Sequence, residues 1–244
     1  MAVRETSPLQ LKDLKLGDDF TLDQDGMLRG SSTVDFEDFI MTGAANLDRL
    51  LYSSIAYSTT VHCNPTHLSA EEYFSQKDKK DMFNRSYGLG EDGQPVKEWG
   101  EPFRRYNEEG WIQSGLVSMV VEEDHQPAGH ILLGITLFEP NAGEHEYCLD
   151  VRVPLIYVVP KYRHKNLWMP LYTVASHLIY TATNQMIAVL PKKTYLDLSF
   201  HADYDSRAGE IIGNGLFSAM EVARDDCPKN KKHRVGTPGY DAGY

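Results

Sequence analysis

The segment from residue 147 to residue 202 constrains the fold of this chain most, because three elements with different periodicities follow one another in it. Residues 147–159 are rich in β-branched and apolar side chains, which is typical of a strand. Residues 193–202 alternate apolar and polar side chains, as a half-buried strand does. Between them, Asn166 is predicted to cap a helix with apolar residues at helical spacing, namely Leu167, Leu171, Val174 and Leu178. The sequence therefore predicts a strand–helix–strand crossover.

Pro154 lies inside the first of these strands. A proline removes one ladder hydrogen bond, so it predicts a bulge or a point where two neighbouring strands separate. Further strands are predicted as an antiparallel hairpin formed by residues 115–121 and 130–138, and as a first strand or short hairpin in residues 19–29 around Asp25 and Gly26. The sheet is therefore predicted to be mostly antiparallel.

Three further helices are predicted, from Ser32 to about Tyr57, in residues 70–87, and from Ser206 to about Asn214. The predicted order is β-α-α-β-β-β-α-β-α, an α+β fold. The chain is predicted to form a single domain of residues 1–244, with an extended N-terminal region in 1–110, a core in 115–218 and a loose polar tail in 225–244, from about Cys227.

Composition narrows the class of protein. With 244 residues, 41% of them apolar, the chain can bury one sizeable core, and no apolar run approaches the ~20 residues that a membrane-spanning helix needs. A net charge of −11 opposes binding to nucleic acid or to an anionic membrane. Three widely spaced cysteines and an N-terminus without an apolar signal segment favour a cytoplasmic protein. His62, Cys63 and His67 do not complete a tetrahedral zinc site, so no metal is predicted.

A basic turn, residues 161–165, stands out in this acidic chain. Lys161, Arg163 and Lys165 lie where the strand ends and the next helix begins. Helix N-termini bind anions because their first amides point outward, so a diphosphate would fit. The alternative is a solvated basic loop that balances nearby acidic residues.

Residues 158–172 (VVPKYRHKNLWMPLY) and 205–217 resemble two motifs of the GNAT superfamily of N-acetyltransferases. Val158, Pro160 and Arg163 match the first motif, in which a loop binds the pyrophosphate of coenzyme A. The resemblance covers about residues 115–218 and implies a GNAT-like fold, an acyl-CoA cofactor, most simply acetyl-CoA, and an amine acceptor on a small molecule or protein. The cofactor-binding residues that it implies are Leu155, Ile156, Tyr157, Val158, Arg163, His164, Lys165, Asn166, Leu167, Trp168 and Asp205.

The sequence departs from the family pattern at the positions that matter for chemistry. Asn166 and Trp168 stand where the family has small residues, and Ile212 stands where it has a general-acid tyrosine. The candidate replacements for acid–base work are Asp150, His201 and Tyr204, with Glu144, Glu146 and Asp203 as weaker candidates. The lost glycines and tyrosine favour an alternative: a non-catalytic interaction protein on the same scaffold, such as a phage-type effector that binds a host protein through the N-terminal helices.

Overall fold

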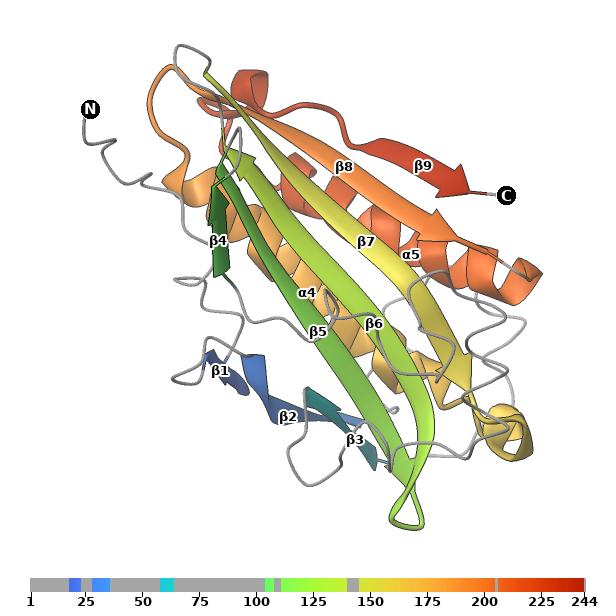
Figure 1. The fold of residues 1–244 in the computed structure, drawn as a ribbon. Coiled ribbons are helices and arrows are strands. Elements are labelled where there is room, and N and C mark those ends of the chain that lie inside the picture. Colours follow the sequence, from blue (N-terminus) through green and yellow to red (C-terminus); the bar gives the residue numbers. More distant parts are fainter. Residues whose placement is uncertain are drawn as a thin grey trace.

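The computed structural model describes residues 18–22, 28–35, 58–63, 104–107, 111–139, 145–204 and 206–243. These residues form an α+β fold in which two long helices cover one face of a mixed sheet (Figure 1). The strands are β1 (Phe20–Leu22), β2 (Leu28–Asp35), β3 (Ser58–Cys63), β4 (Arg104–Asn107), β5 (Trp111–Glu123), β6 (Gln126–Glu139), β7 (Glu146–Val158), β8 (Tyr195–Asp203) and β9 (Gly239–Gly243).

The order of these strands in the sheet is β1-β2-β3-β5-β6-β7-β8-β9, with β4 paired to β5. All described pairs from β1 to β7 are antiparallel, whereas β7–β8 and β8–β9 are parallel. Helix α4 (Trp168–Val189) connects β7 to β8. The predicted crossover, the mostly antiparallel α+β class and the β5–β6 hairpin are thus confirmed, and of the two predictions for residues 19–29 the hairpin, β1–β2, is present.

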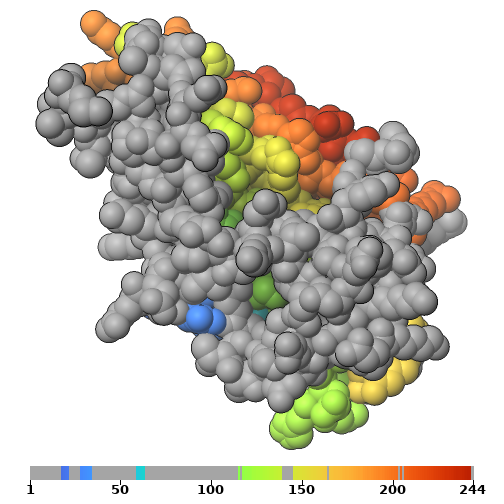
Figure 2. Space-filling view, viewed as in Figure 1, coloured from blue at the N-terminus to red at the C-terminus, as the bar shows by residue number. Residues whose placement is uncertain are grey.

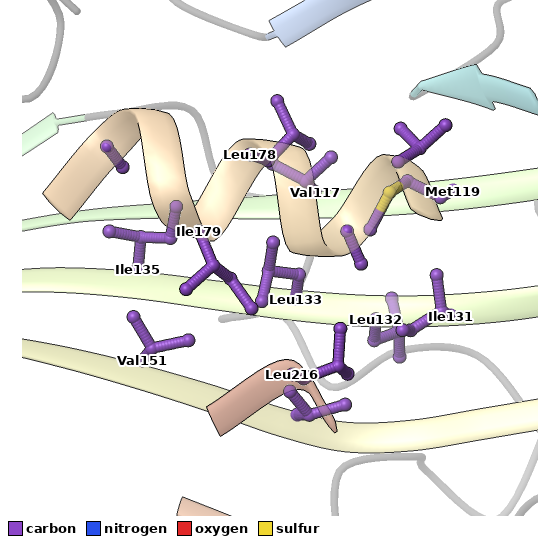
Figure 3. Close-up of a cluster of buried hydrophobic side chains, with 14 of the residues drawn as sticks. Val117, Met119, Ile131, Leu132, Leu133, Ile135, Val151, Leu178, Ile179 and Leu216 are labelled. Carbon is purple, nitrogen blue, oxygen red and sulfur yellow. The ribbon is translucent and has the colours of Figure 1, made fainter. Parts of the chain in front are cut away.

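The core lies between the sheet and helices α4 and α5 (Arg207–Asp225). Alternate residues of a strand point to one face, and on the face toward the helices Val117 of β5, Leu133 and Ile135 of β6 and Val151 of β7 are fully buried. Leu178 and Ile179 of α4 and Leu216 of α5 meet this face, as Figure 3 shows with Val117, Ile135 and Val151 among others. Burial of this apolar layer fixes which face of each strand is left for polar side chains. Neither α4 nor α5 is long and apolar enough to cross a membrane.

The prediction that a helix begins at Ser32 is wrong. Residues 32–35 belong to β2, where Thr33 is paired with Thr60 and Val34 with Thr59 of β3. Threonine and valine suit a pleated surface, and pairing with a strand from farther along the chain overrides the local N-cap signal. The described element order therefore differs from the predicted one, since β3, β4 and β9 were not anticipated. Residues 36–57 and the helix predicted in 70–87 lie outside the described residues.

The C-terminal predictions also need correction. Ser206 does begin the last helix, where its Oγ accepts a hydrogen bond from the Gly209 amide at 3.2 Å, but α5 runs on to Asp225 instead of ending near Asn214. The tail predicted to be loose forms a short 3₁₀ helix, η4 (Lys232–Arg234), and then β9, which pairs in parallel with β8. Cys227 and Val235 are buried, so this segment belongs to the core of the fold.

Candidate functional site at the ends of the parallel strands

Strands β7 and β8 stop pairing partway along β7. Their last paired residues are Val153 and Ala202, and β8 ends one residue later, whereas β7 continues to Val158 along β6. Pro154 lies at this point, and the β6–β7 register shifts there, with two β7 residues between Arg152 and Leu155 set against one on β6. The separation predicted from Pro154 is therefore present as a bulge. Crevices at the carboxyl ends of parallel strands are the usual ligand sites of such sheets.

Beyond Val153, alternate backbone groups of β7 point to the edge along which β8 no longer pairs with it. The amide of Val159 donates to the Ala128 carbonyl of β6 at 2.9 Å, so by alternation the backbone groups of Ile156 and Val158 face the other edge. The carbonyl of Val158 there accepts a hydrogen bond from Nε of Arg163 at 3.0 Å. This bond shows that the Val158 carbonyl points to the edge of β7 away from β6, and that this acceptor is already used.

The basic turn is a 3₁₀ helix, η3 (Pro160–Lys165), followed by Asn166 in the left-handed region with φ 55° and ψ 28°. Asn166 therefore does not cap α4 as predicted. It ends η3, and Leu167 precedes the first residue of α4 without a side-chain cap. A right-handed residue followed by a left-handed one directs successive amides into one concavity, which is a geometry that binds anions.

The charged side chains of this turn are engaged within the protein. Lys165 forms an ion pair with Glu123 at the β5–β6 turn, and the hydrogen bond that it donates to Glu123 raises the pKa of Lys165 above its usual value. The guanidinium of Arg163 lies 5.8 Å from the ring centroid of Tyr157, and Lys161 lies 4.5 Å from that of Tyr162. The alternative of a loop that balances local acid thus has direct support at Lys165.

The other predicted cofactor-binding residues lie around the same place. Leu155 and Tyr157 are buried in the last part of β7, and Ile156 is partly buried against the core. Leu167 is fully buried, and Trp168 packs against the core and contacts Tyr172 edge-on, with ring centroids 6.4 Å apart. The backbone of His164 lies within η3, and Asp205 lies outside the described residues.

A second group of polar residues lies on the sheet face opposite the helices, on strands β7, β8 and β9. Asp150 and Arg152 of β7 are register partners of Ser199 and His201 of β8, and His201 is the partner of Asp241 on β9. Figure 2 views the molecule from this side and shows residues of β7, β8 and β9 reaching the surface next to one another. The structure therefore brings two predicted catalytic residues, Asp150 and His201, together.

Each of these side chains has a defined neighbour. Asp150 is only 3% exposed, and its Oδ2 accepts a hydrogen bond from Nε of Arg152 at 2.7 Å. Nε2 of His201 lies 2.8 Å from Oγ of Ser199 and 3.0 Å from Oδ1 of Asp150. Only the contact with Ser199 has hydrogen-bond geometry, and Oδ1 of Asp150 accepts no hydrogen bond from the described residues. Nδ1 of His201 lies 3.3 Å from Oδ2 of Asp241.

The third predicted catalytic residue, Tyr204, is not part of this group. Its hydroxyl is hydrogen-bonded to that of Tyr240, which packs with Phe200 and Phe217 beneath α5. The Tyr204 ring also lies against Gly213 of α5. Tyr204 is thus held in the packing between α5 and β9, on the helix side of the sheet. Ile212, at the position of the family tyrosine, is buried in the core.

Two residues of the polar group, Ser199 and Asp241, were missed from the sequence. Ser199 carries a signal, since it is two residues from His201 on an alternating strand and must share its face. Asp241 carries none, because β9 is placed beside β8 by a long-range pairing. Of the weaker candidates, Glu146 is exposed at the start of β7, the side chain of Asp203 is not described, and Glu144 lies outside the described residues.

Neither a reactive thiol nor a metal cluster is found in the part of the chain that the structure describes. Burial, together with the nearby Asp197, Asp150 and Glu146, raises the pKa of Cys148 to about 11, so this thiol stays protonated at neutral pH. No group of three or more metal-ligating side chains is present among the described residues. Nδ1 of His62 lies 2.7 Å from Oγ of Ser31, and His67 is not described.

Searches against protein-family models, curated proteins and solved structures found no match to this chain, so its site is interpreted from its own geometry.

Proposed function

We propose that this protein is an acyl-CoA-dependent N-acyltransferase with a GNAT-like arrangement, in which the cofactor lies where β7 and β8 separate. The observation that carries the proposal is the end of the parallel pairing at Val153 and Ala202, while β7 continues to Val158. An extended pantetheine chain matches such a gap, because it can take a hydrogen bond from the strand edge at Ile156 as a further strand would.

The diphosphate end of the cofactor would lie at η3 and the start of α4. The favourable groups there are the backbone amides that follow Lys165 and Asn166, together with the N-terminus of the 22-residue helix α4. Since Arg163 is hydrogen-bonded to the Val158 carbonyl and Lys165 to Glu123, the backbone contributes more than the side chains. Asn166 occupies a left-handed conformation that glycine also adopts freely, so its backbone suits the role of a family glycine.

The proposed reaction is direct attack of an acceptor amine on the thioester carbonyl. The neutral amine nitrogen bonds to the carbonyl carbon, the carbon–sulfur bond breaks, and the thiolate leaves. The nitrogen gives its surplus proton to water, and the thiolate takes a proton from water. A thiol with a pKa near 8.5 leaves adequately at neutral pH, so no protein acid is required, consistent with the burial of Ile212 and the distant placement of Tyr204. The buried carboxylate of Asp150, on the polar face, would attract the acceptor ammonium.

Calorimetric titration tests this proposal before any acceptor is known. We expect acetyl-CoA and CoA to bind with a Kd below about 100 µM, and pantetheine, which lacks the diphosphate, to bind at least tenfold more weakly. Lys165→Glu should weaken CoA binding at least tenfold, because it places a negative charge at the diphosphate. Lys232→Glu is the matched control, since it makes the same charge change beside Asp225 and should leave the affinity unchanged. Absence of binding by the wild-type chain would contradict the proposal.

A second candidate function is a non-catalytic interaction protein on the same scaffold. It is favoured by one specific observation: Arg163 and Lys165 are already engaged inside the protein, as in a turn that serves stability. In that case acetyl-CoA gives no heat and no thermal shift, and Lys165→Glu lowers the melting temperature through lost pairing with Glu123. The titration therefore separates the two candidates.

A further inference from the structure

We propose that Ser199, His201 and Asp241 form a nucleophilic site that cleaves carboxylic esters or thioesters through an acyl-serine intermediate. The three residues lie on the sheet face opposite the helices, on adjacent strands β8 and β9. This activity is separate from the acyltransferase proposed above and does not depend on CoA binding.

The proposal assigns one of the two neutral tautomers to His201, the one that serine catalysis requires. In it the proton is on Nδ1, which lies 3.3 Å from Oδ2 of Asp241. In a neutral imidazole the other nitrogen is then an acceptor, and Oγ of Ser199 at 2.8 Å donates its proton to Nε2. Nucleophile, base and orienting carboxylate thus follow one another in the order that serine catalysis requires.

The surroundings favour the charge that forms during attack. When Nε2 takes the serine proton, the imidazolium lies between Asp241 and the buried Asp150, whose Oδ1 is 3.0 Å from Nε2. Arg152 donates through Nε to Asp150, and its two terminal nitrogens have no partner among the described residues. A guanidinium beside His201 supplies hydrogen-bond donors for the oxyanion of the tetrahedral intermediate.

The exposure of Ser199 and His201 and the protonated state of the nearby thiol support this assignment. The His201 side chain is 35% exposed and Ser199 is half-buried, so a small ester reaches the pair from solvent. The nearby Cys148 is not a competitor, because its pKa of about 11 keeps the thiol protonated. A similar pair elsewhere in the sheet, Ser118 with His130 at 2.7 Å, involves a histidine that is 95% buried and serves as a comparison.

The reaction balances with water alone as co-substrate. Oγ of Ser199 bonds to the acyl carbon while its proton moves to Nε2, and the carbon–oxygen or carbon–sulfur bond breaks as the leaving group takes that proton. Water then adds to the acyl-serine, again losing its proton to Nε2, and the acid departs as Oγ is reprotonated. Ser199 and His201 touch the reacting atoms, whereas Asp241 positions the ring.

The test is covalent labelling of the full chain with a fluorophosphonate probe, which needs no natural substrate. We expect the probe on Ser199 by peptide mass spectrometry, no labelling of Ser199→Ala, and unchanged labelling of the matched control Ser118→Ala. His201→Gln should lower the labelling rate at least tenfold. Asp241→Asn should do so as well, while Asp241→Glu should restore most of the rate, and all variants should keep the melting temperature of the wild type within a few degrees.

Three results would overturn the proposal. The first is a folded wild-type chain that takes up no probe at pH 8 while a serine esterase in the same sample is labelled. The second is labelling that persists in Ser199→Ala, which would place the reaction elsewhere. The third is an Asp241→Asn chain that reacts at the wild-type rate, which would leave the carboxylate without a positioning role. Hydrolysis of p-nitrophenyl acetate with an initial burst, lost in Ser199→Ala, would be the corresponding supporting result.

Discussion

At the scale of single residues, His130 shows how one buried group makes the stability of the fold depend on pH. It is 5% exposed on β6, with Nε2 2.7 Å from Oγ of Ser118, and burial lowers its pKa from 6.5 to about 4. The folded chain therefore keeps this ring neutral at pH values where the unfolded chain protonates it. The resulting stability is complete above pH 6.5 and is lost as the pH falls toward 4.

The first prediction concerns the slope of the free energy of unfolding against pH. Between pH 6.5 and pH 4, His130 should lower the free energy of unfolding by roughly 3 kcal/mol, since each pKa unit corresponds to about 1.4 kcal/mol. Urea unfolding across this range should show that the free energy of unfolding of His130→Asn falls by about 3 kcal/mol less than that of the wild type, which is a shallower slope against pH. Ser118→Ala is the control, because it removes the hydrogen-bond partner but leaves the buried imidazole, and it should retain the slope. An unchanged slope in His130→Asn would contradict the assignment.

At the scale of elements, the glycines of α5 are explained by the tyrosines that pack on the helix. A Cβ on Gly213 would lie 1.9 Å from the hydroxyl of Tyr204, and one on Gly215 would lie 2.7 Å from the ring of Tyr172. Both glycines thus let aromatic rings approach the α5 backbone. Part of the sequence that resembles a family motif therefore has a packing role in this fold, whatever ligand the protein binds.

The second prediction uses this close contact. Gly213→Ala should lower the free energy of unfolding by about 1–3 kcal/mol, because overpacking outweighs the gain in helix propensity. In a Tyr204→Leu background the same substitution should be neutral or stabilising, a coupling that a double-mutant cycle measures. Gly209→Ala is the control on the same helix, since its Cβ would make only ordinary contacts, with Oγ of Ser206 at 3.5 Å and with the Tyr204 ring at 3.6 Å. It should stabilise the chain by about 0.5–1 kcal/mol.

At the scale of the whole molecule, the C-terminal segment joins three parts of the fold. Nζ of Lys231 donates to the Ile187 carbonyl at the end of α4 at 3.2 Å, and Arg234 donates to the Pro191 and Thr194 carbonyls before β8. Strand β9 then extends the sheet, and Tyr240 stacks on Phe217 of α5 with ring centroids 4.8 Å apart. Lys231 therefore caps the end of α4 and Arg234 holds the segment that follows it, which gives these two basic residues a structural role.

The third prediction tests that role. Tyr240→Ala should lower the free energy of unfolding by about 2–4 kcal/mol, since it removes an aromatic ring from contact with Phe200 and Phe217. Hydrogen exchange of the β8 amides should accelerate, because β8 would become the effective sheet edge. Asp241→Asn, one residue along, is the control: its side chain is 74% exposed, and the change should cost less than about 1 kcal/mol. Unaltered β8 exchange in Tyr240→Ala would show that β9 contributes little.

The sequence alone determined those elements whose signal is local. The β5–β6 hairpin, the β7–α4–β8 crossover and the start of α5 at Ser206 were predicted because hydrophobic period and capping chemistry are written in neighbouring residues. Pro154 likewise marked the separation of β7 and β8, since a missing amide has the same effect in any surroundings. Alternation on β8 also placed Ser199 and His201 on one face.

Only the tertiary structure decided the rest, because the deciding partners are distant in sequence. Residues 32–35 became a strand through pairing with β3, and the polar tail became β9 through pairing with β8, each against its local pattern. The same long-range pairing brought Asp241 to His201, and packing of β7 against β8 brought Asp150 there. Local propensity is worth less than about 1 kcal/mol per residue, whereas burial and strand pairing stabilise whole segments at once. The free energy of burial and pairing therefore outweighs the local preference of these segments.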